Sequence, residues 1–200
     1  VKPLEGDAVI DFSHPHNLGW ACDYVQTHCC IYICGTTGLN EEQKQLLRQT
    51  ARSCPVFYSA NFSYGIAMLE KVLEQVTPLL KEDFDMEVVE THHDQKQDAP
   101  SGTAAMLVEA MDPDHAFKRV YGREGFVGKR GKEIGIHAIR GGTVAGEHTV
   151  LYLGQDESLK ITHTASSRMI FVNGAWKALA FMAKRPNGYY TMKDLTGEEQ

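Results

Sequence analysis

The fold is decided by residues 30–63, which read CIYICGTTGLNEEQKQLLRQTARSCPVFYSANFS. Residues 30–34 form a short, β-rich apolar run that ends in a Gly-Thr-Thr-Gly turn. Asn40 and Gln43 then occupy the positions of a capping box, which predicts a helix from about residue 41 to 53. A second apolar run follows at residues 56–58. Strands that alternate with helices of about 12 residues are typical of a parallel sheet with helices on its faces.

The flanking residues extend this pattern and then change it. Residues 8–12 predict a buried strand, residues 13–17 a helix start, and residues 64–80 a helix. Beyond them the sequence predicts strands rather than βα units, because apolar and polar residues alternate along several segments. The predicted strands are residues 86–90, 134–140, 147–153 and 159–164, with a long polar loop at 113–133 and a last helix at about 173–184. We therefore expect an α/β section followed by a second, α+β domain.

Composition limits the possible functions. The chain has 200 residues, 42% of them hydrophobic, and a net charge of −6, which disfavours general nucleic-acid binding but not a small anionic substrate. The apolar stretches are shorter than the roughly 20 residues that a membrane span requires. The five cysteines form no Cys-x-x-Cys pair, so we expect buried thiols in a reducing cytoplasm and no metal site.

Residues 90–104, ETHHDQKQDAPSGTA, contain the main candidates for catalytic and anion-binding residues. Ser101, Gly102 and Thr103 are predicted to start a helix, where N–H groups, hydroxyls and the helix dipole favour a carboxylate or phosphate. His92, His93 and Lys96 stand just before this position and suit proton transfer and anion binding.

A structural interpretation of this segment is also open. Ser101 could serve only as the cap of its helix, the commoner role of serine there. The paired histidines could be surface residues or part of a metal site, although consecutive residues of an extended chain point in opposite directions. No third metal ligand lies at a familiar spacing. The residues alone leave both interpretations open.

The string His-His-x-x-Lys-x-Asp-Ala-Pro-Ser-Gly-Thr-Ala, from His92 to Ala104, resembles the signature of the dihydrodipicolinate reductase family. Other segments similar to this family follow one another over nearly all 200 residues. They are Asp11–Ser13, Gly35–Gly38, Ala60–Ser63, Gly146–Thr149, Ala165–Arg168, Phe171 and Gly174–Ala175.

The resemblance implies an NAD(P)H-dependent oxidoreductase that reduces 4-hydroxy-tetrahydrodipicolinate, in the older description dihydrodipicolinate, to tetrahydrodipicolinate in lysine and diaminopimelate biosynthesis. It implies that His92 is the acid/base and Lys96 the proton donor. The implied substrate-binding residues are His93, Lys96, Ser101, Gly102 and Thr103. The implied residues for NADH or NADPH are Gly35, Thr36, Thr37, Ser59, Ala60, Asn61, Phe62, Arg168 and Phe171. Glu147 and His148 are expected to have a structural role.

The resemblance also implies an organisation. Residues 1–63 are expected to form a partial dinucleotide-binding domain of Rossmann type, with three strands. Residues 64–168 are expected to form a substrate-binding and oligomerisation domain, and residues 169–200 to return to the first domain. The family implies a cytoplasmic homotetramer that binds a small cyclic dicarboxylate and neither nucleic acid nor membrane.

One feature of the family is missing from these residues. The family begins with a strand, a Gly-x-Gly-x-x-Gly turn and a helix, and no such fingerprint occurs here. We therefore expect the 200-residue chain to bind NADH and NADPH poorly, with little preference between them, and to turn over slowly. The alternative function is a non-catalytic, dicarboxylate-binding and oligomerising remnant of the enzyme.

Overall fold

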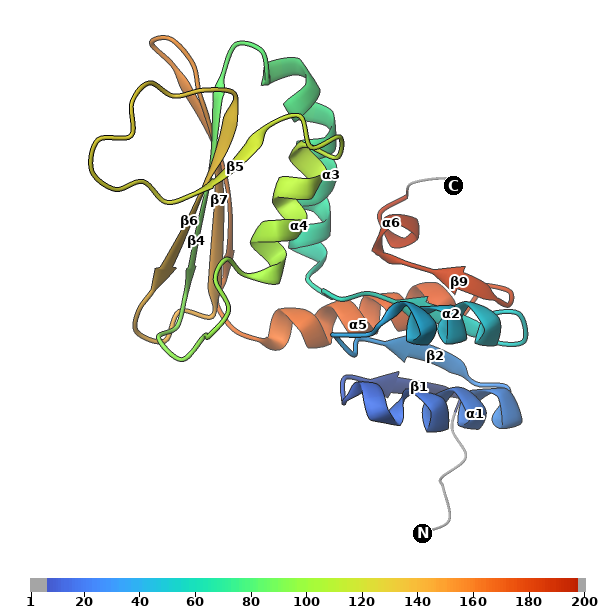
Figure 1. Cartoon of the computed structure of the whole chain (residues 1–200). Helices are drawn as coiled ribbons and strands as arrows, with labels where there is room; N and C mark the ends of the chain where they lie inside the picture. The colour runs from blue at the N-terminus through green and yellow to red at the C-terminus, as the bar shows by residue number, and fades with distance from the viewer. Residues whose placement is uncertain (1–6, 198–200) are drawn as a thin grey trace. The chain divides into compact units, whose positions relative to one another are not determined.

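The computed structural model describes residues 7–197 and divides into two compact units (Figure 1). The first unit comprises Val1–Ala67 and Met169–Gln200, and the second unit comprises Met68–Arg168. Each unit has its own sheet. None of the helices in residues 7–197 combines the length and the apolarity needed to span a bilayer.

The first unit is built on a four-stranded parallel sheet in the order β1-β2-β3-β9. The strands are β1 (Ala8–Asp11), β2 (Ile31–Cys34), β3 (Pro55–Tyr58) and β9 (Gly188–Tyr190). The helices are η1 (Pro15–Asn17), α1 (Leu18–His28), α2 (Glu41–Thr50), α5 (Met169–Met182) and α6 (Met192–Leu195). The predicted capping box is confirmed, because Asn40 and Gln43 exchange side-chain to backbone hydrogen bonds at the start of α2.

Alternation along the strands supplies two separate apolar cores. Tyr32 and Val56 pack with residues of α1 and α2 on one face of the sheet, whereas Ile33 and Phe57 pack with α5 on the other. Helix α5 lies so close to the loop after β3 that a Cβ atom at Gly174 would overlap the carbonyl oxygen of Phe62. This sheet, covered by helices on both faces, confirms the predicted α/β section.

The prediction of three strands in this sheet was wrong, because β9 pairs in parallel with β3. The three residues of β9 follow Pro186 and Asn187 and include Gly188, which together favour a turn in any local interpretation. Long-range pairing with Pro55–Phe57 overrides that local preference. Helix α5 also begins at Met169, earlier than residue 173.

The second unit has a mixed sheet in the order β5-β6-β4-β7-β8. The strands are β4 (Asp85–His92), β5 (Lys118–Tyr121), β6 (Glu133–Arg140), β7 (Gly146–Leu153) and β8 (Ser158–Ala165). Helix α3 (Tyr64–Leu80) runs from the first unit into the second, and α4 (Gly102–Met111) follows β4. The strands predicted from residues 86, 134, 147 and 159 are all present.

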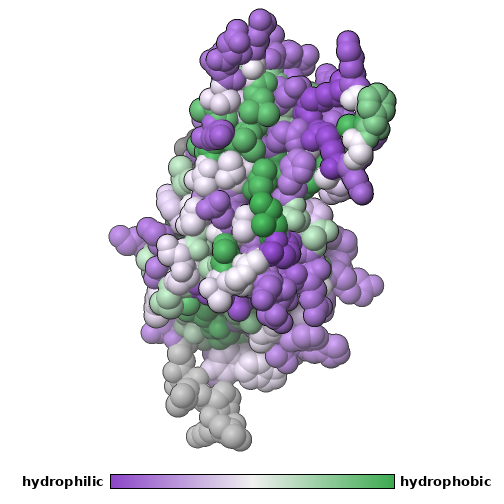
Figure 2. Space-filling model, turned by 90° about the vertical axis from the view of Figure 1, so that its left-hand side faces the viewer, coloured by the Kyte–Doolittle hydropathy of each residue, from purple (hydrophilic) through white to green (hydrophobic). Residues whose placement is uncertain are grey.

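The two faces of this sheet differ. Helices α3 and α4 lie on one face (Figure 1), where Met86, Val88, Ile134 and Tyr152 are buried. No helix of residues 7–197 covers the opposite face, called here the open face, although Arg123 and Arg130 of the loop between β5 and β6 reach Glu87 on it. Figure 2 views the molecule from this side and shows a narrow apolar band between polar side chains. Ile139 on this face is 50% exposed.

The prediction of an uninterrupted loop at residues 113–133 was also wrong. Residues Lys118–Tyr121 form β5, which pairs in parallel with β6. Its four residues show little alternation of apolar and polar side chains and include the basic Lys118 and Arg119, so the sequence of this segment alone does not predict a strand. The segment is recruited as an edge strand by pairing with Glu133–Ile136.

Candidate functional site

The main cluster of chemically useful side chains lies at the end of β4. Glu90 and His92 are two residues apart on the strand, so both point to the covered face. Glu90 is fully buried, and His92 is 8% exposed. Strand pairing places His148 of β7 opposite Glu90 and Arg140 of β6 opposite His92. The register therefore gathers four titratable side chains from three strands.

Glu90 is the centre of this cluster. Its Oε2 lies 2.5 Å from Nδ1 of His92, within hydrogen-bond distance, and accepts a hydrogen bond from Nη1 of Arg140 at 2.8 Å. Its Oε1 accepts from Nη2 of Arg140 at 2.8 Å and from the backbone N–H of Ser101 at 3.0 Å. Burial by itself raises the pKa of Glu90, but the hydrogen bonds from Arg140, His92 and Ser101 outweigh it and lower the pKa below its usual value. The carboxylate is therefore ionised at neutral pH.

Ser101 connects this cluster to helix α4. As the N-cap residue, its Oγ accepts from the N–H of Ala104 at 3.1 Å, and it also lies 3.1 Å from Nε2 of His148. Burial, and then the neighbouring His92, lowers the pKa of His148 to about 4. His148 is therefore neutral at pH 7, and its buried Nδ1 has no hydrogen-bond partner among the described residues.

The loop after β4 contributes the ammonium group of Lys96. Nζ of Lys96 lies 2.8 Å from a carboxylate oxygen of Asp98, and the bond from Lys96 lowers the pKa of Asp98. Nη2 of Arg140 donates to the carbonyl oxygen of Asp98 at 2.6 Å, which ties the loop to β6. The carbonyl of His93 accepts from the N–H of Lys96, and the His93 side chain is half-buried.

The first turn of α4 adds backbone N–H groups to the cluster in the second unit. Gly102 and Thr103 are its first two helical residues, and their N–H groups point out of the helix end, where the dipole is positive. Ser101 caps the helix and touches His148, so the two interpretations of its role are not exclusive. The structure thus brings Ser101, Gly102, Thr103 and His92 together around one end of α4.

The candidate cofactor residues lie at the carboxyl edge of the first unit's sheet. Gly35–Thr37 follow β2, and Ser59–Phe62 follow β3, which pairs with β2 in parallel. Parallel sheets bind ligands at this edge. A Cβ atom at Gly35 would overlap the ring of Phe12, and Oγ1 of Thr36 is buried without a partner among the described residues. The ring of Phe12 already lies against Gly35, so the groups that this edge offers to a nucleotide are the hydroxyls and backbone groups of the two loops.

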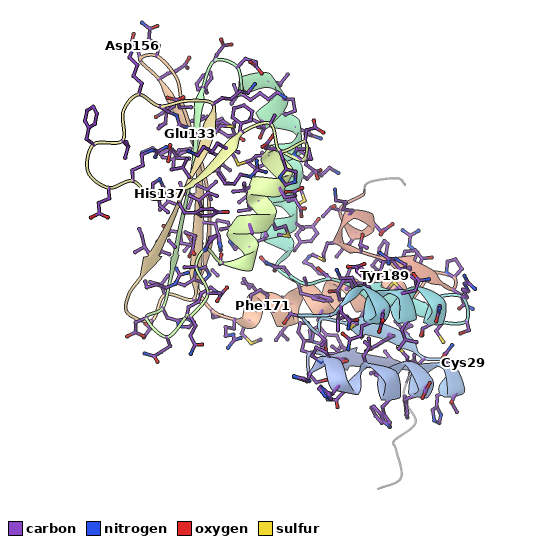
Figure 3. The ribbon with its side chains drawn as sticks, viewed as in Figure 1. Cys29, Glu133, His137, Asp156, Phe171 and Tyr189 are labelled. Atoms are coloured by element: carbon purple, nitrogen blue, oxygen red, sulfur yellow. The ribbon has the colours of Figure 1, made fainter. Side chains whose placement is uncertain are left out.

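The remaining candidate cofactor residues have different surroundings. Ser59 Oγ accepts from the N–H of Asn61 and donates to its carbonyl, so these two residues shape the loop. Phe62 is 1% exposed, and its ring packs at a tilt against Phe57 in the core, which leaves only its backbone for contact with a ligand. Phe171, labelled in Figure 3, packs on the α5 side of the sheet. Arg168 is exposed and ends the second unit.

Three residues of the cluster were not predicted as site residues: Glu90, Arg140 and His148. Glu90 belongs to the same segment as His92, and its even spacing on a strand is the signal that places both on one face. Arg140 and His148 lie far along the chain, and only strand register brings them to Glu90. His148 was expected to be structural, and the structure places it within hydrogen-bond distance of Ser101.

Comparison with protein families decides the assignment. The family model described as dihydrodipicolinate reductase, C-terminus, matches residues 65–196, and the model described as dihydrodipicolinate reductase, N-terminus, matches residues 2–62. This chain belongs to the dihydrodipicolinate reductase family. The resemblance seen in the sequence is thereby confirmed.

Curated relatives agree with this assignment. The 4-hydroxy-tetrahydrodipicolinate reductase of Clostridium tetani is 41% identical over 191 residues, covering 94% of this chain and 75% of the relative. That of Staphylococcus saprophyticus is 44% identical over 196 residues, covering 97% and 80%. A dipicolinate-bound dihydrodipicolinate reductase from Paenisporosarcina sp. TG-14 matches with a TM-score of 0.74 at 22% identity, covering 92% of this chain and 71% of that one. This likeness confirms the predicted fold class.

Proposed function

We propose that this chain converts 4-hydroxy-tetrahydrodipicolinate to tetrahydrodipicolinate in lysine and diaminopimelate biosynthesis: the 4-hydroxyl leaves as water, and NADH or NADPH supplies a hydride that is added together with one proton. The family assignment and the relatives named for this reaction support the activity. The observation in the structure that carries it is the buried His92, hydrogen-bonded to an ionised carboxylate beside the N-terminus of α4. No specific observation favours the alternative of a non-catalytic remnant.

The substrate is a ring with two carboxylates, and the second unit offers groups of the matching charge. We assign one carboxylate to the Ser101 hydroxyl and the N–H groups of Gly102 and Thr103 at the helix end. Lys96 and His93, on the loop before it, supply donors for the rest of the anion. Lys96 would leave Asp98 and bind a carboxylate of the substrate instead. This exchange is feasible because both partners are carboxylates and the Lys96–Asp98 ion pair is only partly buried.

Side chains of this protein would donate and accept the protons of the reaction. A bound reduced nicotinamide nucleotide supplies the hydride. Hydride addition leaves electron density on the nitrogen side of the conjugated ring, which a cationic donor neutralises. We assign that proton to Lys96 and the acid/base role to His92, whose ring has one nitrogen on Glu90 and a second nitrogen for proton exchange.

For the nucleotide we assign the carboxyl edge of the first unit. Gly35, Thr36 and Thr37 after β2 would hold it through backbone groups and hydroxyls, and Ser59–Phe62 after β3 would line the next strand end. Phe171 and Arg168 are assigned to the same ligand on the family resemblance. The support in the structure is that the two loops follow neighbouring parallel strands, at the edge where such sheets bind ligands.

We also propose a cytoplasmic homotetramer assembled through the open face of the second unit. The support is the apolar band on this face (Figure 2) and the half-exposed Ile139. The division into residues 1–63, 64–168 and 169–200 is retained as the proposed domain organisation.

The activity is tested by following NADH and NADPH oxidation with enzymatically generated 4-hydroxy-tetrahydrodipicolinate. Turnover with either nucleotide is expected, and it should be inhibited by pyridine-2,6-dicarboxylate. Binding of the dicarboxylate without any turnover would favour the non-catalytic alternative. If the chain neither bound the dicarboxylate nor oxidised the nucleotide, the reductase function and the non-catalytic alternative would both be contradicted.

A further inference from the structure

We infer that Glu90, held by Arg140, is a positioning residue that fixes His92 as the Nδ1–H tautomer and so presents Nε2 as the nitrogen that exchanges the proton. This inference rests on the proposed role of His92 as the acid/base. It adds two residues, both from outside the sequence-predicted site, to the machinery of the reaction.

The first step concerns the charge of Glu90. A fully buried carboxylate is tolerated only when its lone pairs are satisfied and its charge is balanced. Here two N–H donors of Arg140 bind both oxygens, and the backbone of Ser101 and the ring of His92 supply one donor each. These four hydrogen bonds match the four acceptor sites of an ionised carboxylate.

The second step concerns the proton on His92. Nδ1 of His92 lies 2.5 Å from Oε2 of Glu90. An ionised carboxylate only accepts hydrogen bonds, so Nδ1 must carry the hydrogen. In the neutral ring, Nε2 is then the nitrogen with the lone pair. When Nε2 takes a proton, the resulting cation is already beside a carboxylate, which stabilises it.

The third step concerns the space around Nε2. A Cβ atom at Gly146, on β7, would lie 3.1 Å from this nitrogen, so any side chain there would crowd it. Gly146 also has a φ of +157°, a conformation that disfavours other residues. The strand next to His92 thus carries no side chain at the point where the reacting nitrogen is presented.

Glu90→Gln separates this role from a purely structural one. In either orientation the new amide NH₂ faces one N–H of Arg140. Placed at Oε1 it would also oppose the N–H of Ser101, whereas placed at Oε2 it can donate to Nδ1 of His92. The second orientation costs less, and it forces His92 into the Nε2–H tautomer, with the wrong nitrogen protonated.

The experiment is ¹⁵N NMR of the histidine ring nitrogens at a pH where His92 is neutral, with steady-state kinetics on the same samples. Wild type should show the Nδ1–H tautomer of His92, and Glu90→Gln the Nε2–H tautomer. The kcat should fall by about 10²–10⁴-fold, as expected when an acid/base has the wrong tautomer, with KM changed much less.

The matched control is Glu87→Gln, the same substitution three residues earlier on β4. Glu87 points to the open face, where it pairs with Arg123, Arg130 and His137, which is labelled in Figure 3. It removes a carboxylate from an ion-pair network without touching His92, so the His92 tautomer should stay Nδ1–H. A change of tautomer in both variants would show a general effect of losing a charge on β4 and would overturn the inference.

An Nε2–H tautomer in wild type would also overturn it, and this readout requires neither turnover nor a variant that folds. Retention of the Nδ1–H tautomer and normal kcat in Glu90→Gln would do the same. Failure of the proposed function is recognised separately, because His92→Gln would then keep its kcat whatever the tautomer of His92.

Discussion

At the residue scale, the site depends on how buried charge is balanced on β4. Glu90 is held ionised by Arg140, whereas His148, on the neighbouring strand, is held neutral, because burial lowers its pKa to about 4. A neutral His148 adds no positive charge beside His92. The two residues thus set the electrostatics around the proposed acid/base in different ways.

The low pKa of His148 predicts a specific loss of stability in acid. Well above pH 6.5 the imidazole is neutral in both the folded and the unfolded state, and it has no effect on the free energy of unfolding. As the pH falls from 6.5 towards about 4, the unfolded chain takes up a proton that the folded protein does not, so the free energy of unfolding decreases. The total decrease from this group is about 3 kcal/mol.

Denaturant unfolding of wild type and His148→Gln between pH 4 and 8 measures this effect. The variant should have a shallower pH dependence below pH 6.5 and a curve parallel to wild type above pH 7. Parallel curves over the whole range would show that His148 is not held neutral in the folded protein.

Sequence reasoning reached some of these residues and not others. Ser101 was predicted as a helix cap and His92 as a site residue, because both lie in one continuous segment. Arg140 lies 50 residues after Glu90, and nothing local connects the two until β4 and β6 pair. Register between strands was the missing information.

At the scale of elements, α5 is packed against the loop after β3 through Gly174. Gly174→Ala would drive a methyl group into the Phe62 carbonyl, and we expect the stability of the first unit to fall by about 3 kcal/mol, the upper end of the usual cost of overpacking. The matched control is Gly19→Ala in α1, where nothing lies within 4 Å of the added Cβ, and it should be neutral or stabilising by up to about 1 kcal/mol. Thermal unfolding of both variants decides this, and equal stabilities would contradict the close packing of α5.

Helix α4 predicts the preference of the second unit for ligands. With its N-terminus assigned to one carboxylate and the Lys96 loop to the other, pyridine-2,6-dicarboxylate should stabilise the protein by about 2.7 kcal/mol at 100 times its dissociation constant. The monocarboxylate picolinate should stabilise it much less at the same concentration. Differential scanning fluorimetry with both ligands measures this, and equal shifts would remove the dicarboxylate assignment.

Helices and strands were predicted correctly where the local sequence pattern was strong. They were missed where a strand forms only because it pairs with another strand. The capping box at Asn40 and the long helix at residues 64–80 were readable, and the structure has both. Strand β5 has four residues and pairs with β6, from which a loop separates it. Strand β9 has three residues and pairs with β3, which is distant in the sequence. Such edge strands acquire their structure from a partner rather than from their own sequence.

At the scale of the whole molecule, the proposed tetramer places the open face in an interface. Ile139→Asp would put a charge on the apolar band, so the variant should show a lower mass than wild type in light scattering after size-exclusion chromatography. Leu79→Asp is the matched control, because Leu79 is 79% exposed and lies on α3, away from the open face. A wild-type mass of one chain, or an unchanged Ile139→Asp mass, would contradict assembly through this face.

The central claim is that this chain is a reductase whose acid/base is His92, and one comparison tests it most directly. Steady-state reduction of 4-hydroxy-tetrahydrodipicolinate is measured at saturating substrate and nucleotide for wild type and His92→Gln, with dicarboxylate binding followed in parallel. The account predicts that kcat falls by about 10²–10⁴-fold in His92→Gln while pyridine-2,6-dicarboxylate still binds. A kcat for His92→Gln close to that of wild type would contradict it.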